Sequence, residues 1–141
     1  MNPRNLDGVE RPVPPVRSYS APYWEATRER RLLLQYDVEV GRHQFYPRPT
    51  SIFTGRRSHL EWREVSGRGV VASFTIVERA PPAFRGFEPY PLILVTLPEQ
   101  VQIMSNLVDC RIEALTTGMA VRPAWAPLAD GRHILLFRPD R

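Results

Sequence analysis

Residues Val70-Val71-Ala72-Ser73-Phe74-Thr75-Ile76-Val77 decide the fold, because apolar side chains recur at every second position, as in a half-buried β-strand. The predicted apolar face carries Val70, Ala72, Phe74 and Ile76. We expect this face, with Phe74, to pack in a core. A second stretch, residues 92–97, is apolar at nearly every position, which is typical of a central strand covered on both faces.

The rest of the C-terminal half continues as short strands separated by turn residues. Residues 101–107 alternate, and residues 112–115 resemble a short helical turn that Gly118 ends. Two further strands, over residues 119–125 and 133–137, are joined by a turn at Asp130-Gly131. Short strands with glycine corners and one short helix predict a small closed barrel over residues 63–141, with the OB-fold among the candidates.

Three different segments are predicted before the barrel. Residues 1–19 are rich in proline and alternate in charge, so we expect an extended arm that is ordered only on a partner. Residues 20–35 are predicted to form a helix, with Ser20 as its cap and Pro22 in its first turn. Residues 36–62 alternate extended pieces with turns that end in glycine, which predicts two small hairpins. The fold class is therefore mostly β with an N-terminal helix.

Composition limits the function classes. The net charge is +4, and every one of the 19 Lys+Arg residues is arginine. Arginine suits phosphates and carboxylates, but no concentrated basic stripe is present, so nucleic-acid binding is disfavoured. No apolar run approaches the roughly 20 residues of a membrane helix. The single cysteine and the absence of an N-terminal apolar segment predict a cytoplasmic protein without an internal disulfide.

Short stretches across residues 20–139 resemble, in their order and spacing, an acyl-CoA-associated family, the domain-of-unknown-function family thirty-five. These stretches are Tyr23-Trp24-Glu25-Ala26, Leu32-Leu33-Leu34-Gln35, Gln44-Phe45-Tyr46-Pro47-Arg48-Pro49, Leu60-Glu61-Trp62, Val65-Ser66-Gly67-Arg68-Gly69-Val70-Val71, Ser105-Asn106-Leu107-Val108 and Gly118-Met119-Ala120-Val121. The resemblance implies a rubredoxin-like zinc ribbon over residues 36–62, followed by an OB-fold barrel.

The resemblance also implies two Cys-x-x-Cys knuckles, whose cysteines are missing here. The matching positions are Asp37, Val40, Ser51 and Thr54. Structural zinc needs four nitrogen or sulfur ligands, so we predict a degenerate ribbon that binds no metal and is held by packing. His43 and His59 suggest a metal site with Asp37, but no fourth ligand is apparent, and both are interpreted as ordinary surface or interface histidines.

No catalytic set can be assembled from the sequence. Cys110 is the only thiol, and a buried structural cysteine is the better interpretation, because no base or activating group accompanies it. The proline-rich segment over residues 80–91 carries Phe84, Phe87 and Tyr90. This aromatic loop is expected either to fold over the barrel mouth or to contact a ligand or partner.

The resemblance implies a non-catalytic scaffolding subunit of an acyl-CoA-processing enzyme. The usual partner would be a thiolase-like protein, meaning a lipid-transfer-protein-type thiolase, aldolase or acyltransferase, in a hetero-oligomer. This chain would bind no cofactor of its own, but a coenzyme A thioester could be a shared ligand. The expected contact residues are Trp24, Arg48, Phe53, Arg56, Arg57, Phe84, Arg85 and Phe87. Three alternatives remain open: an accessory subunit of a hot-dog-fold hydratase, an OB-fold protein that binds single-stranded nucleic acid, and a stand-alone thioester enzyme.

Overall fold

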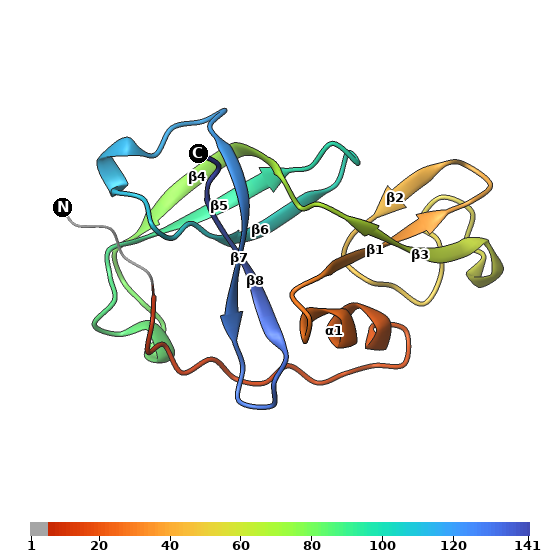
Figure 1. Cartoon of the computed structure of the whole chain (residues 1–141), viewed down its shortest axis with the longest axis horizontal. Coiled ribbons are helices and arrows are strands. Elements are labelled where there is room, and N and C mark those ends of the chain that lie inside the picture. Colours follow the sequence, from red (N-terminus) through yellow and green to blue (C-terminus); the bar gives the residue numbers. More distant parts are fainter. Residues whose placement is uncertain (1–5) are drawn as a thin grey trace.

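The chain folds into two antiparallel sheets, a small ribbon followed by a barrel (Figure 1). The computed structural model describes residues 6–141. The ribbon has the strand order β2-β1-β3, and the barrel has the order β6-β5-β4-β7-β8. The strands are β1 (Leu32–Asp37), β2 (Arg42–Gln44), β3 (Leu60–Val65), β4 (Gly69–Val77), β5 (Tyr90–Thr96), β6 (Gln102–Asn106), β7 (Ala120–Pro127) and β8 (His133–Pro139). The helical elements are α1 (Ala21–Thr27) and the 3-10 turns η1 (Arg57–His59), η2 (Pro82–Phe84) and η3 (Ile112–Ala114). Over the described residues, no helix has the length and apolar character to cross a membrane.

The larger sheet closes into a barrel with OB-fold connectivity. Its hydrogen-bonded strand pairs are antiparallel, and a parallel bridge between Leu107 and Phe137 closes the gap from the end of β6 to β8. The Val108 amide donates a 2.8 Å hydrogen bond to the Phe137 carbonyl at this bridge. Val121 and Phe137 are fully buried in the core that the closed sheet encloses. The predicted barrel is confirmed, and the predicted helical turn at residues 112–115 is η3.

In strand β4, the residues that the alternation predicted to face the core do not all do so. Val71 is 1% exposed, whereas Val70 and Phe74 are 43% and 40% exposed. The register with β5 also shifts between Val71 and Ser73, and such a bulge breaks the alternation of facing along a strand. The prediction that Phe74 lies in the core is therefore wrong.

The predicted helix over residues 20–35 is much shorter than expected. Helix α1 ends at Thr27, Arg30 adopts a positive φ of 57°, and residues 32–37 form strand β1. The ambiguous run of leucines becomes a strand because β1 is the centre of the ribbon, paired with β2 on one side and β3 on the other. Pro22 lies in the first turn as predicted, but Ser20 makes no cap hydrogen bond; its hydroxyl donates to the Arg17 carbonyl instead.

Helix α1 is clamped to the tip of the β7–β8 hairpin by buried polar groups. Thr27 is fully buried, and its hydroxyl accepts a 3.1 Å hydrogen bond from the His133 amide. The His133 ring Nδ1 lies 2.7 Å from the Thr27 carbonyl, to which it can only donate. Arg28 adds a 2.6 Å hydrogen bond to the Asp130 carbonyl. The helix is therefore fixed against the barrel as well as against the ribbon that follows it.

The proline-rich arm lies on this chain's own barrel, running from the β4–β5 loop to the β7–β8 hairpin (Figure 1). Leu6 is 5% exposed and packs in a second apolar cluster. The other buried members of that cluster are Tyr90, Val108 and Leu136. Further along the arm, Arg132 Nη2 donates a 2.7 Å hydrogen bond to the Pro14 carbonyl. The prediction that the arm needs a partner for order is wrong from Leu6 onward; residues 1–5 lie outside the described part.

The aromatic loop folds over the barrel, which was one of its two expected arrangements. Phe84 and Phe87 pack against the second apolar cluster, and the Phe84 ring stacks on Tyr90 with centroids 5.0 Å apart. The Arg11 guanidinium of the arm lies over the same Phe84 ring, 5.1 Å from its centroid. Loop and arm therefore stabilise one another.

Candidate functional site

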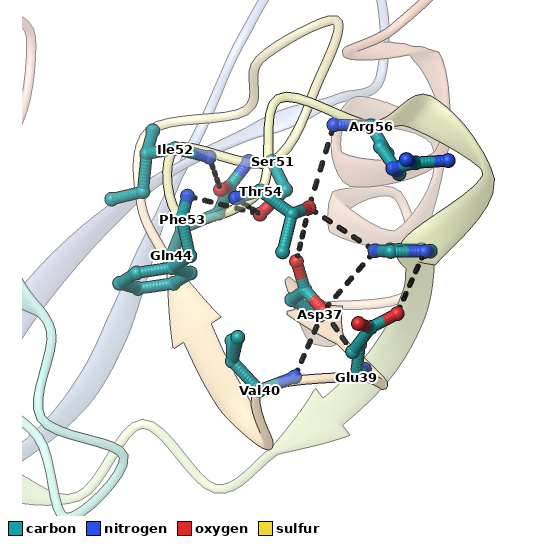
Figure 2. A network of polar contacts seen from close by, with 10 residues as sticks. Asp37, Glu39, Val40, Gln44, Ser51, Ile52, Phe53, Thr54 and Arg56 are labelled. Atoms are coloured by element: carbon teal, nitrogen blue, oxygen red, sulfur yellow. Dashed lines mark hydrogen bonds and ion pairs between the residues drawn. The ribbon is translucent and has the colours of Figure 1, made fainter.

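Asp37, at the first position where the family resemblance implies a zinc-binding cysteine, organises its own turn. The Asp37 side chain is fully buried at the end of β1. Its Oδ1 accepts hydrogen bonds of 2.8 Å from the Glu39 amide and 3.2 Å from the Val40 amide (Figure 2). The Gly41 amide then donates to the Asp37 carbonyl at 2.8 Å, closing the turn. One carboxylate oxygen thus satisfies the backbone donors at positions i+2 and i+3.

The second knuckle repeats this arrangement around a hydroxyl. Ser51 Oγ accepts hydrogen bonds from the Phe53 amide at 3.1 Å and the Thr54 amide at 3.2 Å. The two knuckles are joined directly, because Thr54 Oγ1 lies 2.9 Å from Asp37 Oδ2 and donates to it (Figure 2). Three of the four predicted ligand positions therefore meet in one hydrogen-bonded network, which we call the knuckle network (Asp37, Ser51 and Thr54).

Asp37 is held as a carboxylate by this network. Burial acts to raise its pKa, but hydrogen bonds from Ser51, Val40, Thr54 and Glu39 outweigh burial and lower the pKa to about 2. The negative charge therefore persists inside the ribbon, satisfied by converging N–H and O–H donors, with His59 Nδ1 4.0 Å from Asp37 Oδ1.

These residues do not fit the zinc that the family resemblance implies. Val40 has no ligand atom, its side chain is 42% exposed, and the Thr54 hydroxyl is already committed to Asp37. Within residues 6–141, no group of three or more histidine, cysteine or carboxylate side chains is arranged to hold a metal ion. The absence of bound zinc stays a prediction with a direct chemical test.

His59 belongs to the knuckles, contrary to its interpretation as an ordinary surface or interface histidine. Its Nδ1 lies 3.2 Å from Thr54 Oγ1, and its Nε2 lies 3.0 Å from Glu39 Oε2. Its side chain is only 18% exposed and links the two turns. His43 is not part of this group; its ring packs edge-on against Tyr36, with centroids 4.7 Å apart.

Two buried glutamines position the loop between the knuckles. The side-chain oxygen of Gln35 accepts a hydrogen bond from the backbone N–H of Arg48, and the side-chain NH2 of Gln35 donates one to the Arg48 carbonyl. Both hydrogen bonds are 2.8 Å long. Gln44 donates to Gln35 at 2.7 Å and accepts from the Ile52 amide at 2.8 Å. Because both side chains are almost fully buried, the loop that carries Tyr46 is fixed from within the ribbon.

An aromatic groove of about 340 Å³ opens where the arm, α1, the ribbon loop and the barrel meet. Its lining residues are Pro15, Arg17, Tyr19, Ser20, Tyr23, Trp24, Phe45, Tyr46, Pro47, Ile103, Met104, Ile134 and Leu135. Tyr46 and Met104 are 51% and 58% exposed, so they are accessible to a ligand or partner. Tyr23 lies deeper; burial first, and then the nearby Tyr46, raise its pKa far above the ordinary value, so its phenol stays protonated. The only formal charge on the lining is that of Arg17, which suits an apolar ligand with an anionic group.

The eight predicted contact residues do not form one surface. Arg48, Phe53, Arg56 and Arg57 lie on the ribbon, and Trp24 lines the aromatic groove. Phe84, Arg85 and Phe87 lie in the aromatic loop, where the two phenylalanines pack against this chain's own arm. The Trp24 ring already has a cation–π contact within the chain, since the Arg132 guanidinium lies 4.9 Å from its centroid. Sequence reasoning missed Arg17, Tyr19 and Met104, because residues so far apart in sequence meet only in the fold.

Cys110 is buried, as predicted. Burial raises the pKa of its thiol, although Arg141 acts to lower it, and the Sγ contacts the Arg111 carbonyl at 3.3 Å. A protonated, enclosed thiol is a poor nucleophile.

Comparison with known proteins finds relatives of this chain in sequence and in fold. The family model described as "ChsH2, C-terminal OB-fold domain" matches residues 62–126. A DUF35 domain-containing scaffold protein of Pyrococcus furiosus is 36% identical over 99 residues, which are 70% of this chain and 72% of that protein. A probable enoyl-CoA hydratase alpha subunit of Thermomonospora curvata is 30% identical over 132 residues; these are 92% of this chain but only 40% of that protein. A solved chain of an "Ltp2-ChsH2(DUF35) aldolase" superposes with a TM-score of 0.78 at 28% identity, covering 90% of this chain and 98% of that one.

Proposed function

Because the chain belongs to the DUF35 family of OB-fold proteins, we propose that it is a non-catalytic accessory subunit of an acyl-CoA-processing enzyme. One observation carries the proposal most strongly. The match to a chain of the Ltp2-ChsH2(DUF35) aldolase extends over both the ribbon and the barrel, and it includes 98% of that chain. The ribbon retains its shape although its zinc-ligand positions have changed, which favours a retained scaffolding role.

The proposed catalytic partner is a thiolase-like subunit. The support is the aldolase relative, whose description joins an Ltp2 component to a DUF35 component. In this arrangement the partner supplies the nucleophile and base, and this chain supplies surface. The buried, protonated Cys110 agrees with that division.

The aromatic groove is the proposed contact for the shared acyl-CoA or for the partner beside it. Its volume lies at the small end of the range of roughly 300–1,000 Å³ that is typical of ligand sites. Tyr46 and Met104 offer apolar contact, and Arg17 offers a guanidinium for a phosphate or carboxylate. Part of the site would then be completed by the catalytic subunit.

Affinity purification of the tagged chain from its native cells tests this function. We expect a stoichiometric thiolase-like subunit, and a complex that turns over acyl-CoA. Tyr46→Ala and Met104→Ala should weaken acyl-CoA binding or assembly, whereas Met119→Ala, a residue that does not line the groove, should leave both unchanged. A chain that purifies as a monomer without an acyl-CoA enzyme would contradict the proposal.

A hydratase complex is the second candidate. The Thermomonospora curvata relative is described as a probable enoyl-CoA hydratase alpha subunit, and it aligns with 92% of this chain. The same purification separates the two candidates. A hydratase complex would contain a hot-dog-fold partner and would hydrate enoyl-CoA, whereas the first candidate would contain a thiolase-like partner and would form or cleave a carbon–carbon bond.

The arm argues against the nucleic-acid alternative. OB-folds commonly hold single strands between the loop that joins their first two strands and the loop that joins their last two. Here the arm runs between these loops, with Arg11 over Phe84 and the Pro14 carbonyl bound by Arg132. An intramolecular segment thus occupies the path between these loops.

A further inference from the structure

The two knuckle turns expose aliphatic side chains at the end of the ribbon. Val38 is 50% exposed, Val40 is 42% exposed and Ile52 is 56% exposed. All three belong to the turns that Asp37, Thr54 and Gln44 hold by hydrogen bonds, and Figure 2 shows Val40 and Ile52 among them. Exposed apolar side chains that gather at one end of a molecule mark a contact surface.

Three exposed arginines lie in the same end of the ribbon as these aliphatic groups. Arg42, Arg56 and Arg57 are all exposed, and in the described part of the chain none of them forms an ion pair. The Arg42 guanidinium lies 4.5 Å from the Phe53 ring centroid, which holds this side chain beside Ile52. In Figure 2 the Arg56 side chain points away from the knuckle network. We call this surface the knuckle tip (Val38, Val40, Ile52, Arg42, Arg56 and Arg57).

The carboxylates of the ribbon do not neutralise this charge. Asp37 is enclosed by its donors, and Glu39 is paired with His59 at 3.0 Å. Glu64 is paired with Arg31 at 2.8 Å, at the other end of the small sheet. Glu61 is paired with Arg63. The three arginines outnumber the one exposed carboxylate of these turns, Glu39, so the knuckle tip keeps a net positive charge beside its apolar groups.

We propose that the knuckle tip docks onto an acidic protein surface of the catalytic subunit, one that carries both carboxylates and apolar groups. This inference rests on the proposed function and adds the place and the chemistry of assembly. Aspartate and glutamate side chains match the arginine forks, and the exposed aliphatic groups match an apolar protein patch. A coenzyme A phosphate would use the arginines but leave Val38, Val40 and Ile52 in water. A second copy of this chain would bring like charges together.

The test uses the complex purified with wild-type chain and a matched pair of charge reversals. The variant R56E/R57E changes the knuckle tip, and R79E/R111E makes the same change of net charge at exposed barrel positions. We expect R56E/R57E to slow association with the purified catalytic subunit by about tenfold or more at low salt, with the difference shrinking as salt screens the arginine charges. R79E/R111E should associate like wild type. Ile52→Asp should speed dissociation with unchanged circular dichroism.

Several outcomes would overturn the docking surface. Equal association rates for the two double variants would do so. So would a result in which the isolated chain binds coenzyme A, and R56E/R57E abolishes that binding but leaves assembly intact. A homodimer of the isolated chain that R56E/R57E disperses would assign the tip to self-association instead. Recovery of the wild-type chain without any acyl-CoA enzyme would refute the proposed function, and the docking surface with it, so the two failures are distinguishable.

Discussion

At the scale of single residues, Asp37 is a buried hydrogen-bond acceptor at a position where the family resemblance implies a metal ligand. Four donors converge on its carboxylate, two from its own turn and two from the second knuckle. The family resemblance predicted that Asp37, Val40, Ser51 and Thr54 stand at cysteine positions, and this stays a prediction; the structure brings three of them together. The sequence was not sufficient to predict their network, because side-chain pairing between turns depends on backbone placement that no local pattern encodes.

Replacing Asp37 with asparagine is expected to destabilise the chain and to flatten its response to acid. The folded-state pKa of Asp37 is about 2, below its ordinary value of 3.8, so its stabilising contribution is fully present above pH 4. That contribution falls as pH drops from about 4 toward 2, where the carboxylate becomes protonated in the folded state. Urea unfolding of wild type and Asp37→Asn at pH 7, 4, 3 and 2.5 should show two curves that converge toward low pH.

Asp7→Asn is the control for this experiment, because Asp7 is exposed on the arm. Its acid response should parallel that of wild type. If Asp37→Asn also parallels wild type over the whole range, Asp37 is not the linked carboxylate.

At the scale of elements, the ribbon and the arm show where local sequence patterns failed to predict the structure. The leucines at residues 32–34 fit a helix continuing from α1, yet they form the start of the central ribbon strand, with Leu32 and Leu34 almost fully buried. Propensity could not decide this, because the deciding partners are strands β2 and β3 further along the chain. The arm was similarly misjudged, since the groups that order it belong to the barrel.

Restoring the four cysteines should restore a zinc site in the ribbon. The amides that now bond to Asp37 Oδ1 and Ser51 Oγ would bond to thiolate sulfurs, and the four-residue spacing within each knuckle is intact. The variant D37C/V40C/S51C/T54C is expected to hold one zinc by elemental analysis and to lose thermal stability when a chelator is added. Wild type is expected to hold no zinc and to keep its melting temperature in chelator; stoichiometric zinc in dialysed wild type would show that the degenerate knuckles still bind metal.

Leu6 is expected to fasten the arm to the barrel. It is 5% exposed within the cluster that also contains Tyr90 and Leu136, so Leu6→Ala should leave a cavity and lower the free energy of unfolding by about 2–4 kcal/mol. Chemical denaturation measures this loss. Val16→Ala serves as control, because Val16 is 48% exposed and should change stability by less than about 0.5 kcal/mol. Equal effects of the two substitutions would mean that the arm does not pack as described.

At the scale of the whole molecule, the chain combines a rigid barrel with surfaces that its own core does not use. The family resemblance predicted the mostly β fold and the barrel correctly, because ordered short motifs survive even when individual ligand residues change. It did not predict which aromatic groups remain available. Phe84 and Phe87 turned inward against the arm, whereas Tyr46 and Met104 remained accessible in the aromatic groove.

The isolated chain is expected not to turn over acyl-CoA. Its single thiol is enclosed and protonated, so Cys110→Ala should leave the activity of the assembled complex within about twofold of wild type. Steady-state assays of the chain alone, the partner alone and the complex measure this directly. Turnover by the chain alone, lost in Cys110→Ala, would make Cys110 a nucleophile.

The oxygen-based knuckle network has a consequence for damage by oxidants. Ribbons closed by zinc thiolates open when peroxide converts their sulfurs to sulfenic acids or disulfides. Here the equivalent contacts run between a carboxylate, two hydroxyls and backbone amides, none of which peroxide attacks. The ribbon should therefore keep its shape under oxidative stress, and when zinc is scarce, in conditions that would unfold a relative closed by four cysteines.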